Sequence, residues 1–234
     1  PPQARRPFVF MTHFVGTPAF TDLPPTIPVF PLPGLLLLPG GQLPLHLFEE
    51  RYRDMIRDAI KTDRAIGIIQ PRDPNNSEWA PTLYGIGCLG RIVSFRESED
   101  GRYHTTLTGV CRFDITGEIT GEAQYRRMNV DYMRYKNDMA EDRDEAEGLI
   151  DRATFMPLLK KFLTQFEVDV DWNALDKVDD APLLRSLAMT CPFEPSEKQA
   201  ILEAETSADR GHLIAALMQM AAVHAGDDDE RKLQ

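Results

Sequence analysis

The sequence predicts an α+β fold, in which a β-rich half that contains one helix is followed by a helical half. Between residues 26 and 137, short runs of β-branched and aromatic residues alternate with turn-forming residues, which is typical of strands. One amphipathic helical pattern interrupts these runs between residues 49 and 60. After residue 137 the composition becomes acidic and helix-favouring, and apolar residues recur at helical spacing.

The chain of 234 residues is long enough for one large domain or two modest ones. We expect four segments: an irregular N-terminal arm over 1–25, a β-rich subdomain over 26–137, a helical subdomain over 138–226 and a charged tail over 227–234. The arm is rich in proline and has no periodic pattern, whereas the tail consists mostly of charged residues.

The first elements lie between residues 27 and 60. Residues 27–32 are apolar and flanked by proline, which suits the end or the edge of a strand. In the next stretch three leucines alternate with other residues, as in a strand with one buried face. The leucines are Leu43, Leu45 and Leu47, and the alternate positions are Pro44, His46 and Phe48.

A helix with one apolar face is predicted after this strand. Its apolar positions are Tyr52, Met55, Ile56, Ala59 and Ile60. Charged residues occupy the other positions: Glu49, Glu50, Arg53, Asp54, Arg57 and Asp58. The spacing predicts a helix that packs on one side only, and the two glutamates in its first turn suit the helix dipole.

Strand patterns and loops fill the remainder of the β-rich segment. "AIGIIQP" is a short apolar run, and "DPNNSEWAPT" is a loop rich in turn formers. The strand patterns "YGIGCLGRIVSF" and "YHTTLTGVCRFDI" are joined at Asp100-Gly101, which is a strong hairpin signal. "YRRMNVDYMRY" continues the β-rich pattern.

The helical half begins with an apolar stripe at Leu149, Ile150, Ala153, Met156, Leu159, Leu163 and Phe166. Pro157 is expected to kink or split this helix. A second helix is expected in "DDAPLLRSLAMTC", with Asp at its N-cap and Pro in its first turn. Two further helices are expected to open with capping boxes, formed by Ser196 with Gln199 and by Thr206 with Asp209.

Two alternatives for the apolar and glycine-rich stretches fail on the sequence. A membrane span needs about 20 mostly apolar residues, but the run at 35–38 is bounded by prolines. The letters "GIGCLG" at 85–90 match a dinucleotide fingerprint, which requires a helix after the glycines. Here β-branched and aromatic residues follow, so we interpret the glycines as sites of close backbone packing in a strand.

Composition narrows the classes of partner and compartment. The net charge of −11 and the pI near 4.9 argue against binding to nucleic acid or to an anionic membrane surface. The odd and widely spaced Cys88, Cys111 and Cys191 support neither a disulfide framework nor a zinc ribbon. We interpret them as buried free thiols of a cytoplasmic protein.

No catalytic constellation can be defended from the sequence. The five histidines lie more than four residues apart and show no metal-ligand spacing. His46 is interpreted as a packing or capping residue and not as a ligand. No G-x-S-x-G elbow is present. We therefore expect no enzymatic activity, no cofactor and no metal.

Four stretches together resemble one known family. "PVFPLPGLLLLPGGQLPLHLFEERY", with Phe48, Glu49, Arg51 and Tyr52, is similar to the start of the LON substrate-binding domain, the N-terminal domain of ATP-dependent Lon proteases. "LYGIGCLGRIVSF", "TLTGVCRFDI" and "LLRSLAMTCPFEPSEKQAILEAE" resemble its later landmarks. The resemblance covers residues 26–222 and implies a PUA-like β pseudo-barrel followed by a helical bundle. No G-x-x-x-x-G-K-[ST] occurs, so the chain is similar to stand-alone bacterial members without the ATPase and protease domains.

The resemblance implies a role in contacting protein substrates. The favoured hypothesis is a non-enzymatic module that recognises exposed apolar or unfolded polypeptide segments, as an adaptor or chaperone-like factor working with a protease or chaperone. The alternative is a small-molecule-binding domain that uses a cleft between the two halves. Trp79 is the candidate polypeptide contact, because aromatic residues on loops are frequent anchors. The competing interpretation is that Trp79 only caps the end of the barrel.

Overall fold

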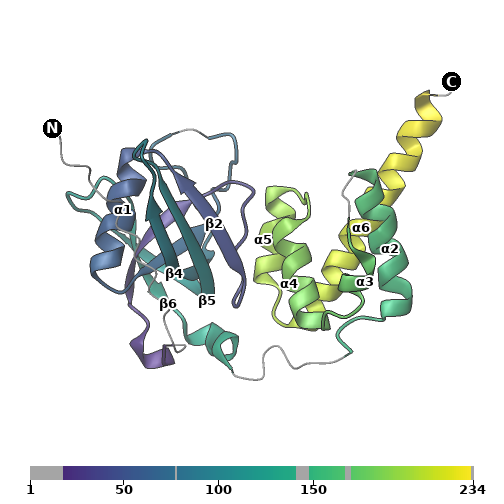
Figure 1. The fold of residues 1–234 in the computed structure, drawn as a ribbon, viewed down its shortest axis with the longest axis horizontal. Coiled ribbons are helices and arrows are strands. Elements are labelled where there is room, and N and C mark those ends of the chain that lie inside the picture. Colours follow the sequence, from purple (N-terminus) through teal and green to yellow (C-terminus); the bar gives the residue numbers. More distant parts are fainter. Residues whose placement is uncertain (1–17, 77, 141–147, 167–169, 233–234) are drawn as a thin grey trace. The chain divides into compact units, whose positions relative to one another are not determined.

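The computed structural model describes residues 18–76, 78–140, 148–166 and 170–232, with side chains described as far as residue 221 (Figure 1). The chain forms two compact units, Pro1–Ala140 and Glu141–Gln234. The first unit is mostly strand and the second is helical, so the predicted α+β class is confirmed. The sequence placed the change of character at residue 137, three residues before the observed division.

The described residues of unit 1 form a six-stranded sheet, one α-helix and two 3-10 helices. In chain order these are η1 (Phe20–Asp22), β1 (Thr26–Pro31), β2 (Gln42–Leu47), α1 (Glu50–Lys61), β3 (Ala65–Ile69), β4 (Ile86–Glu97), β5 (Tyr103–Ile119), β6 (Arg127–Asp131) and η2 (Met133–Met139). The predicted arm over residues 1–25 thus includes η1, and residues 1–17 lie outside the described residues.

The strands close into a barrel. Their order is β2-β5-β4-β3-β1-β6, and β6 also pairs with β5. Closure depends on the length of β5, which spans 17 residues. Its first half pairs with β2 and its second half with β6, while β4 runs along most of its length. Only β1 and β3 are parallel, and the other pairs are antiparallel.

The predicted faces of β2 and α1 are largely confirmed. In β2 the leucines are buried, whereas Gln42, Pro44 and His46 are exposed. In α1 the buried residues are Tyr52, Met55, Ile56 and Ala59, and Ile60 is only partly buried. Two arginines of the charged face contact Tyr103 of β5 and are not surrounded by solvent alone. Arg57 donates to the hydroxyl of Tyr103 (Nη2 to Oη, 3.3 Å), and the Arg53 guanidinium lies over the Tyr103 ring at 5.1 Å.

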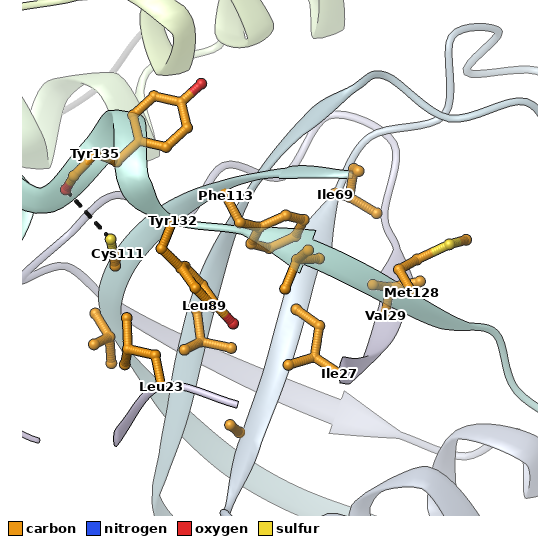
Figure 2. Packing of buried hydrophobic residues seen from close by; sticks show 13 residues of the cluster. Leu23, Ile27, Val29, Ile69, Leu89, Cys111, Phe113, Met128, Tyr132 and Tyr135 are labelled. Carbon is orange, nitrogen blue, oxygen red and sulfur yellow. Dashed lines mark hydrogen bonds between the residues drawn. The ribbon is translucent and has the colours of Figure 1, made fainter. Parts of the chain in front are cut away.

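The barrel interior is filled around Phe113, as Figure 2 shows. The Phe113 ring meets the Tyr132 ring edge-on, with 6.4 Å between their centroids, and Ile27 and Leu89 point into the same interior. Gly87, a member of the "GIGCLG" stretch, lies in β4 against this ring. A Cβ added there would stand 2.5 Å from Phe113 Cζ. The close-packing interpretation of the glycines is confirmed at this position.

A buried ion pair fixes η2 to the barrel. Arg112 of β5 donates to Asp138 of η2 through Nε (2.9 Å) and Nη2 (2.8 Å), and its backbone N–H donates to the same carboxylate at 3.0 Å. The side chains are only 6% and 10% exposed. The Arg112 guanidinium also lies over the Tyr135 ring, at 4.8 Å from its centroid. This contact holds the chain just before the end of unit 1.

Unit 2 is helical throughout its described elements. They are α2 (Arg152–Gln165), α3 (Trp172–Leu175), α4 (Asp180–Thr190), α5 (Pro195–Glu203) and α6 (Ser207–Lys232). α2 packs on α6, which also contacts α4 and α5. Helix α6 runs to Lys232, into the segment expected as a charged tail, and residues 233–234 lie outside the described residues.

Three predictions about unit 2 need correction. Helix α2 continues through Pro157, so of the predicted kink or split the split is excluded; its buried side chains are Phe155, Leu159, Phe162 and Leu163. The buried face of α2 is rotated from the predicted one. It includes Phe162, whose ring stacks on the ring of Phe193 with 5.4 Å between their centroids. The capping box of α5 joins Glu194 to Glu197 and not Ser196 to Gln199. The box of Thr206 and Asp209 is confirmed, with Asp209 N donating to Thr206 Oγ1 at 3.0 Å.

The buried face of α1 gives a first test of the fold. We expect Ile56→Asp to lower the free energy of unfolding by several kcal/mol, because Ile56 is fully buried and the new carboxylate would have no partner. The control is Asp54→Ala on the same helix, whose partly exposed pair with Arg57 should contribute less than about 1 kcal/mol. Urea denaturation midpoints measure both, and equal effects would show that the helix phase is wrong.

The buried ion pair gives a second test. Asp138→Ala would leave the Arg112 guanidinium buried without its carboxylate, which should cost about 3–5 kcal/mol. Lys61→Ala is the control, because its pair with Asp58 is mostly exposed on both sides, and it should leave the denaturation midpoint almost unchanged. A tolerated loss of Asp138 would mean that η2 is not held by this contact.

Candidate functional site

Within the described residues, no group of three or more His, Cys, Asp or Glu side chains could hold a metal ion. The three cysteines are free and buried. Burial raises the pKa of Cys111 to about 12 and that of Cys191 to about 11, so these thiols stay protonated and unreactive at neutral pH. Within the same residues, no helix is long and apolar enough to cross a membrane.

Two exposed aromatic side chains lie at the amino end of α1. Phe48 directly precedes the N-cap residue of α1 and is 70% exposed. Trp79, in the loop between β3 and β4, is 55% exposed, and its carbonyl accepts a hydrogen bond from Arg51 of α1 at 3.4 Å. We call these two exposed side chains, taken together, the Phe48–Trp79 surface. An exposed aromatic ring is a candidate contact for another molecule, and Arg51 links the backbone of the Trp79 loop to the helix that follows Phe48.

The exposure of Phe48 follows from the residues around it. An apolar residue just before an N-cap often packs against the fourth residue of the helix in a hydrophobic staple. Here that fourth residue is Arg53, whose guanidinium lies over the Tyr103 ring. Phe48 therefore has no apolar partner in the staple position and stays in solvent.

The motif F-E-x-R-Y positions the Trp79 loop. The Glu49 carboxylate accepts from Arg51 (Nε, 3.0 Å; Nη2, 2.9 Å) and makes no side-chain cap for α1. The Arg51 guanidinium also lies over the Tyr52 ring at 4.4 Å, and Tyr52 packs on Phe30 of β1 at 4.1 Å. Arg51 is thus held from two sides while it donates to the carbonyl of Trp79. This hydrogen bond is long at 3.4 Å and lies in solvent, so it restrains the loop only weakly although its donor is charged.

Three arginines brace the arm that carries Trp79, which we define as residues 79–83. Alternate carbonyls of this arm accept from guanidinium groups: Trp79 from Arg51 (3.4 Å), Pro81 from Arg126 (2.6 Å) and Leu83 from Arg72 (3.2 Å). The intervening Thr82 carbonyl accepts from the Arg72 backbone N–H at 2.8 Å. Four carbonyls of the arm thus accept hydrogen bonds from arginines outside it, which restrains its backbone.

The brace from Arg126 is the best anchored of the three. Its guanidinium forms a two-pronged ion pair with Glu118, with both N–O distances at 2.7 Å. The hydrogen bonds from Arg126 lower the pKa of the Glu118 carboxyl from its ordinary value, so the pair stays ionised at neutral pH. Because the side chain of Arg126 is only 11% exposed, its donation to the Pro81 carbonyl is largely shielded from water.

The arrangement suits contact with a partner molecule. A rigid aromatic side chain loses little conformational entropy when it contacts a partner. The sequence singled out Trp79, and the structure places it on the surface with its backbone fixed. Sequence reasoning listed Phe48 in the motif but did not assign it to the site. The signal was available: an aromatic residue before an N-cap, with arginine in the staple position.

Comparisons with known proteins give a consistent result. The model of the ATP-dependent protease La (LON) substrate-binding domain matches residues 26–220. The chain is 27% identical over 202 residues to Lon protease 2 of Myxococcus xanthus, covering 84% of this chain and 24% of that protein. It is 24% identical over 183 residues to Lon protease of Dictyoglomus thermophilum, covering 78% and 23%. The chain thus spans about a quarter of the length of these relatives.

Two solved structures share the fold. The Lon N-terminal domain protein from Xanthomonas campestris superposes with a TM-score of 0.58 at 21% identity, over 82% of this chain and 97% of that one. The N-terminal domain of the Mycobacterium avium complex Lon protease gives 0.58 at 18% identity, over 83% and 98%. Both similarities extend over nearly the whole of the compared domain.

The bracing of the arm can be tested directly. Arg126→Gln removes the donor to the Pro81 carbonyl, a charge-assisted hydrogen bond of about 1.5–3 kcal/mol. We expect amide hydrogen exchange in residues 72–84 to become about tenfold to hundredfold faster. The neighbouring Arg127→Gln, on an exposed position of β6, is the control and should leave this exchange unchanged. Equal exchange in both variants would show that the arm does not depend on Arg126.

Proposed function

This chain belongs to the LON substrate-binding domain family, and from this membership we propose that it binds polypeptides through their exposed apolar or unfolded segments. The proposal assigns no catalytic step to the chain, because the family match is to a substrate-binding domain and not to a protease domain. In this role it would act as an adaptor or chaperone-like factor beside a protease or chaperone.

The observation that carries the proposal is the braced Phe48–Trp79 surface. An unfolded segment loses conformational freedom when it binds, so its binding surface gains most from groups that are already ordered. Trp79 meets this requirement, because the carbonyls of its arm are fixed by Arg51, Arg126 and Arg72. Since the segment must still be ordered, we expect modest affinity, on the order of micromolar.

We also propose that the chain acts in the cytoplasm. Cys88, Cys111 and Cys191 are buried and unbridged. Free thiols of this kind are common in reducing compartments, whereas secreted domains tend to use cysteines in disulfides.

The test is a titration of fluorescently labelled model polypeptides, unfolded by reduction, with the purified chain. We expect saturable binding of the unfolded forms and much weaker binding of their native forms. Phe48→Ala and Trp79→Ala should each weaken binding at least about tenfold, as expected for aromatic anchors. Met133→Ala is the matched control, because Met133 is 67% exposed on η2 and lies outside the Phe48–Trp79 surface. Fluorescence anisotropy of the label gives the dissociation constants.

Salt concentration separates apolar from charge-driven binding. A chain of net charge −11 does not attract acidic segments, and apolar contact is nearly independent of salt in the physiological range. We expect the dissociation constant to change little between low and physiological ionic strength. Binding that collapses with modest salt would overturn the apolar mechanism. Binding to none of the polypeptides would instead favour the small-molecule alternative.

A further inference from the structure

Two of the five histidines lie directly opposite each other on the barrel. His46 of β2 and His104 of β5 are register partners, and their ring centroids are 4.5 Å apart with an interplanar angle of 64°. His46 is exposed and His104 is partly exposed. The two residues are 58 positions apart in the chain, so no spacing motif could have joined them.

The hydrogen-bond register explains why the rings are so close. Gly109 N donates to Gly41 O and Gly109 O accepts from Gly40 N, both at 2.8 Å, so Gly109 makes ladder hydrogen bonds one step beyond the end of β2. Hydrogen-bonded and non-hydrogen-bonded pairs alternate along an antiparallel ladder. His46 and His104 therefore form a non-hydrogen-bonded pair, the type that brings cross-strand side chains closest together.

The ring separation matches that of two imidazoles on one metal ion. A metal–nitrogen distance of about 2.0–2.1 Å puts each ring centroid about 3.2 Å from the ion. Two such rings are about 4.5 Å apart when the nitrogen–metal–nitrogen angle is a right angle, and about 5.2 Å apart when it is tetrahedral. The observed 4.5 Å would allow two adjacent ligands of a square-planar or octahedral ion, and it is also the separation of an ordinary edge-on contact between two rings.

From this geometry we propose that His46 and His104 form a two-histidine site for a divalent transition-metal ion such as Ni²⁺ or Cu²⁺. Imidazole is a preferred ligand of both ions, and both favour right-angled coordination. Among the described residues no third ligand completes the site, so water fills the remaining positions. The site uses neither Phe48 nor Trp79 and does not depend on the proposed function.

Two neighbouring positive charges oppose the ion. Arg96 of β4 is the register partner of His104 on the side away from β2, and it is exposed. Arg102 precedes His104 by two residues, and its mostly exposed side chain pairs with Asp100. Both arginines raise the free energy of a bound cation. On the other side of the pair, the next two rows hold Gln42, Pro44, Thr106 and Thr108 and add no charge. The ion is therefore expected on the β2 side of His104.

The experiment is calorimetric titration of the full chain, without an affinity tag, with Ni²⁺, which does not oxidise the free thiols. We expect saturable binding that EDTA reverses. His46→Gln and His104→Gln should each weaken it at least about tenfold. His212→Gln, at an exposed position of α6 in unit 2, is the matched control and should bind as the unmodified chain does. Arg96→Gln should bind at least as tightly, because it removes one of the two opposing charges.

Circular dichroism of each variant shows whether it is folded, and exposed positions such as His46 are expected to tolerate glutamine. Loss of binding in both folded pair variants, with retention in His212→Gln, would support the site. Unchanged binding in the pair variants would place the ion on other histidines and overturn the proposal. No saturable binding by the unmodified chain would overturn it as well.

Discussion

The long strand β5 is the constraint on which unit 1 depends. Along one edge, this strand of 17 residues pairs first with β2 and then with β6. Along the other edge it pairs with β4. The ladder accommodates this by register shifts between Leu89 and Gly90, between Ile92 and Ser94, and between Ile115 and Gly117. Such bulges increase the local twist that a small barrel needs for closure. With the edge closed, the second half of β5 offers no unpaired ladder to other chains.

Closure also dictates what can fill the interior. Phe113, on the second half of β5, points into the barrel and requires space on the strands opposite. Gly67 of β3 and Gly87 of β4 provide it, since an added Cβ at either would stand within 2.9 Å of the Phe113 ring. The Phe113 ring therefore requires a residue without a Cβ at both positions. The glycine-rich stretch is a packing feature of this barrel, although its letters match a nucleotide fingerprint.

Local periodicity made much of this fold predictable. The alternation in β2, the apolar face of α1 and the turn at Asp100-Gly101 are properties of neighbouring residues, and the structure confirms them. The contacts that define the candidate site are not local. The braces to Trp79 and Pro81 join residues 28 and 45 positions apart, and the histidine pair joins two strands. The rotation of α2 was missed for the same reason, because Phe193, beyond the helix, sets the position of Phe162.

The role of the positive charge around the Trp79 arm follows from the contacts of each arginine. Three arginines near one loop would suggest an anion-binding patch. Each guanidinium is already engaged: Arg51 with Glu49 and the Tyr52 ring, Arg126 with Glu118, and Arg72 with the Tyr84 ring, in addition to the carbonyls they brace.

A guanidinium has five N–H donors in a fixed plane, so each donor directed to a carbonyl or carboxylate of the chain is withdrawn from an outside anion. The three arginines thereby fasten the backbone of the arm, while the Trp79 side chain that it carries stays exposed. Positive charge in a strongly acidic chain can in this way support a loop without turning the loop into an anion site.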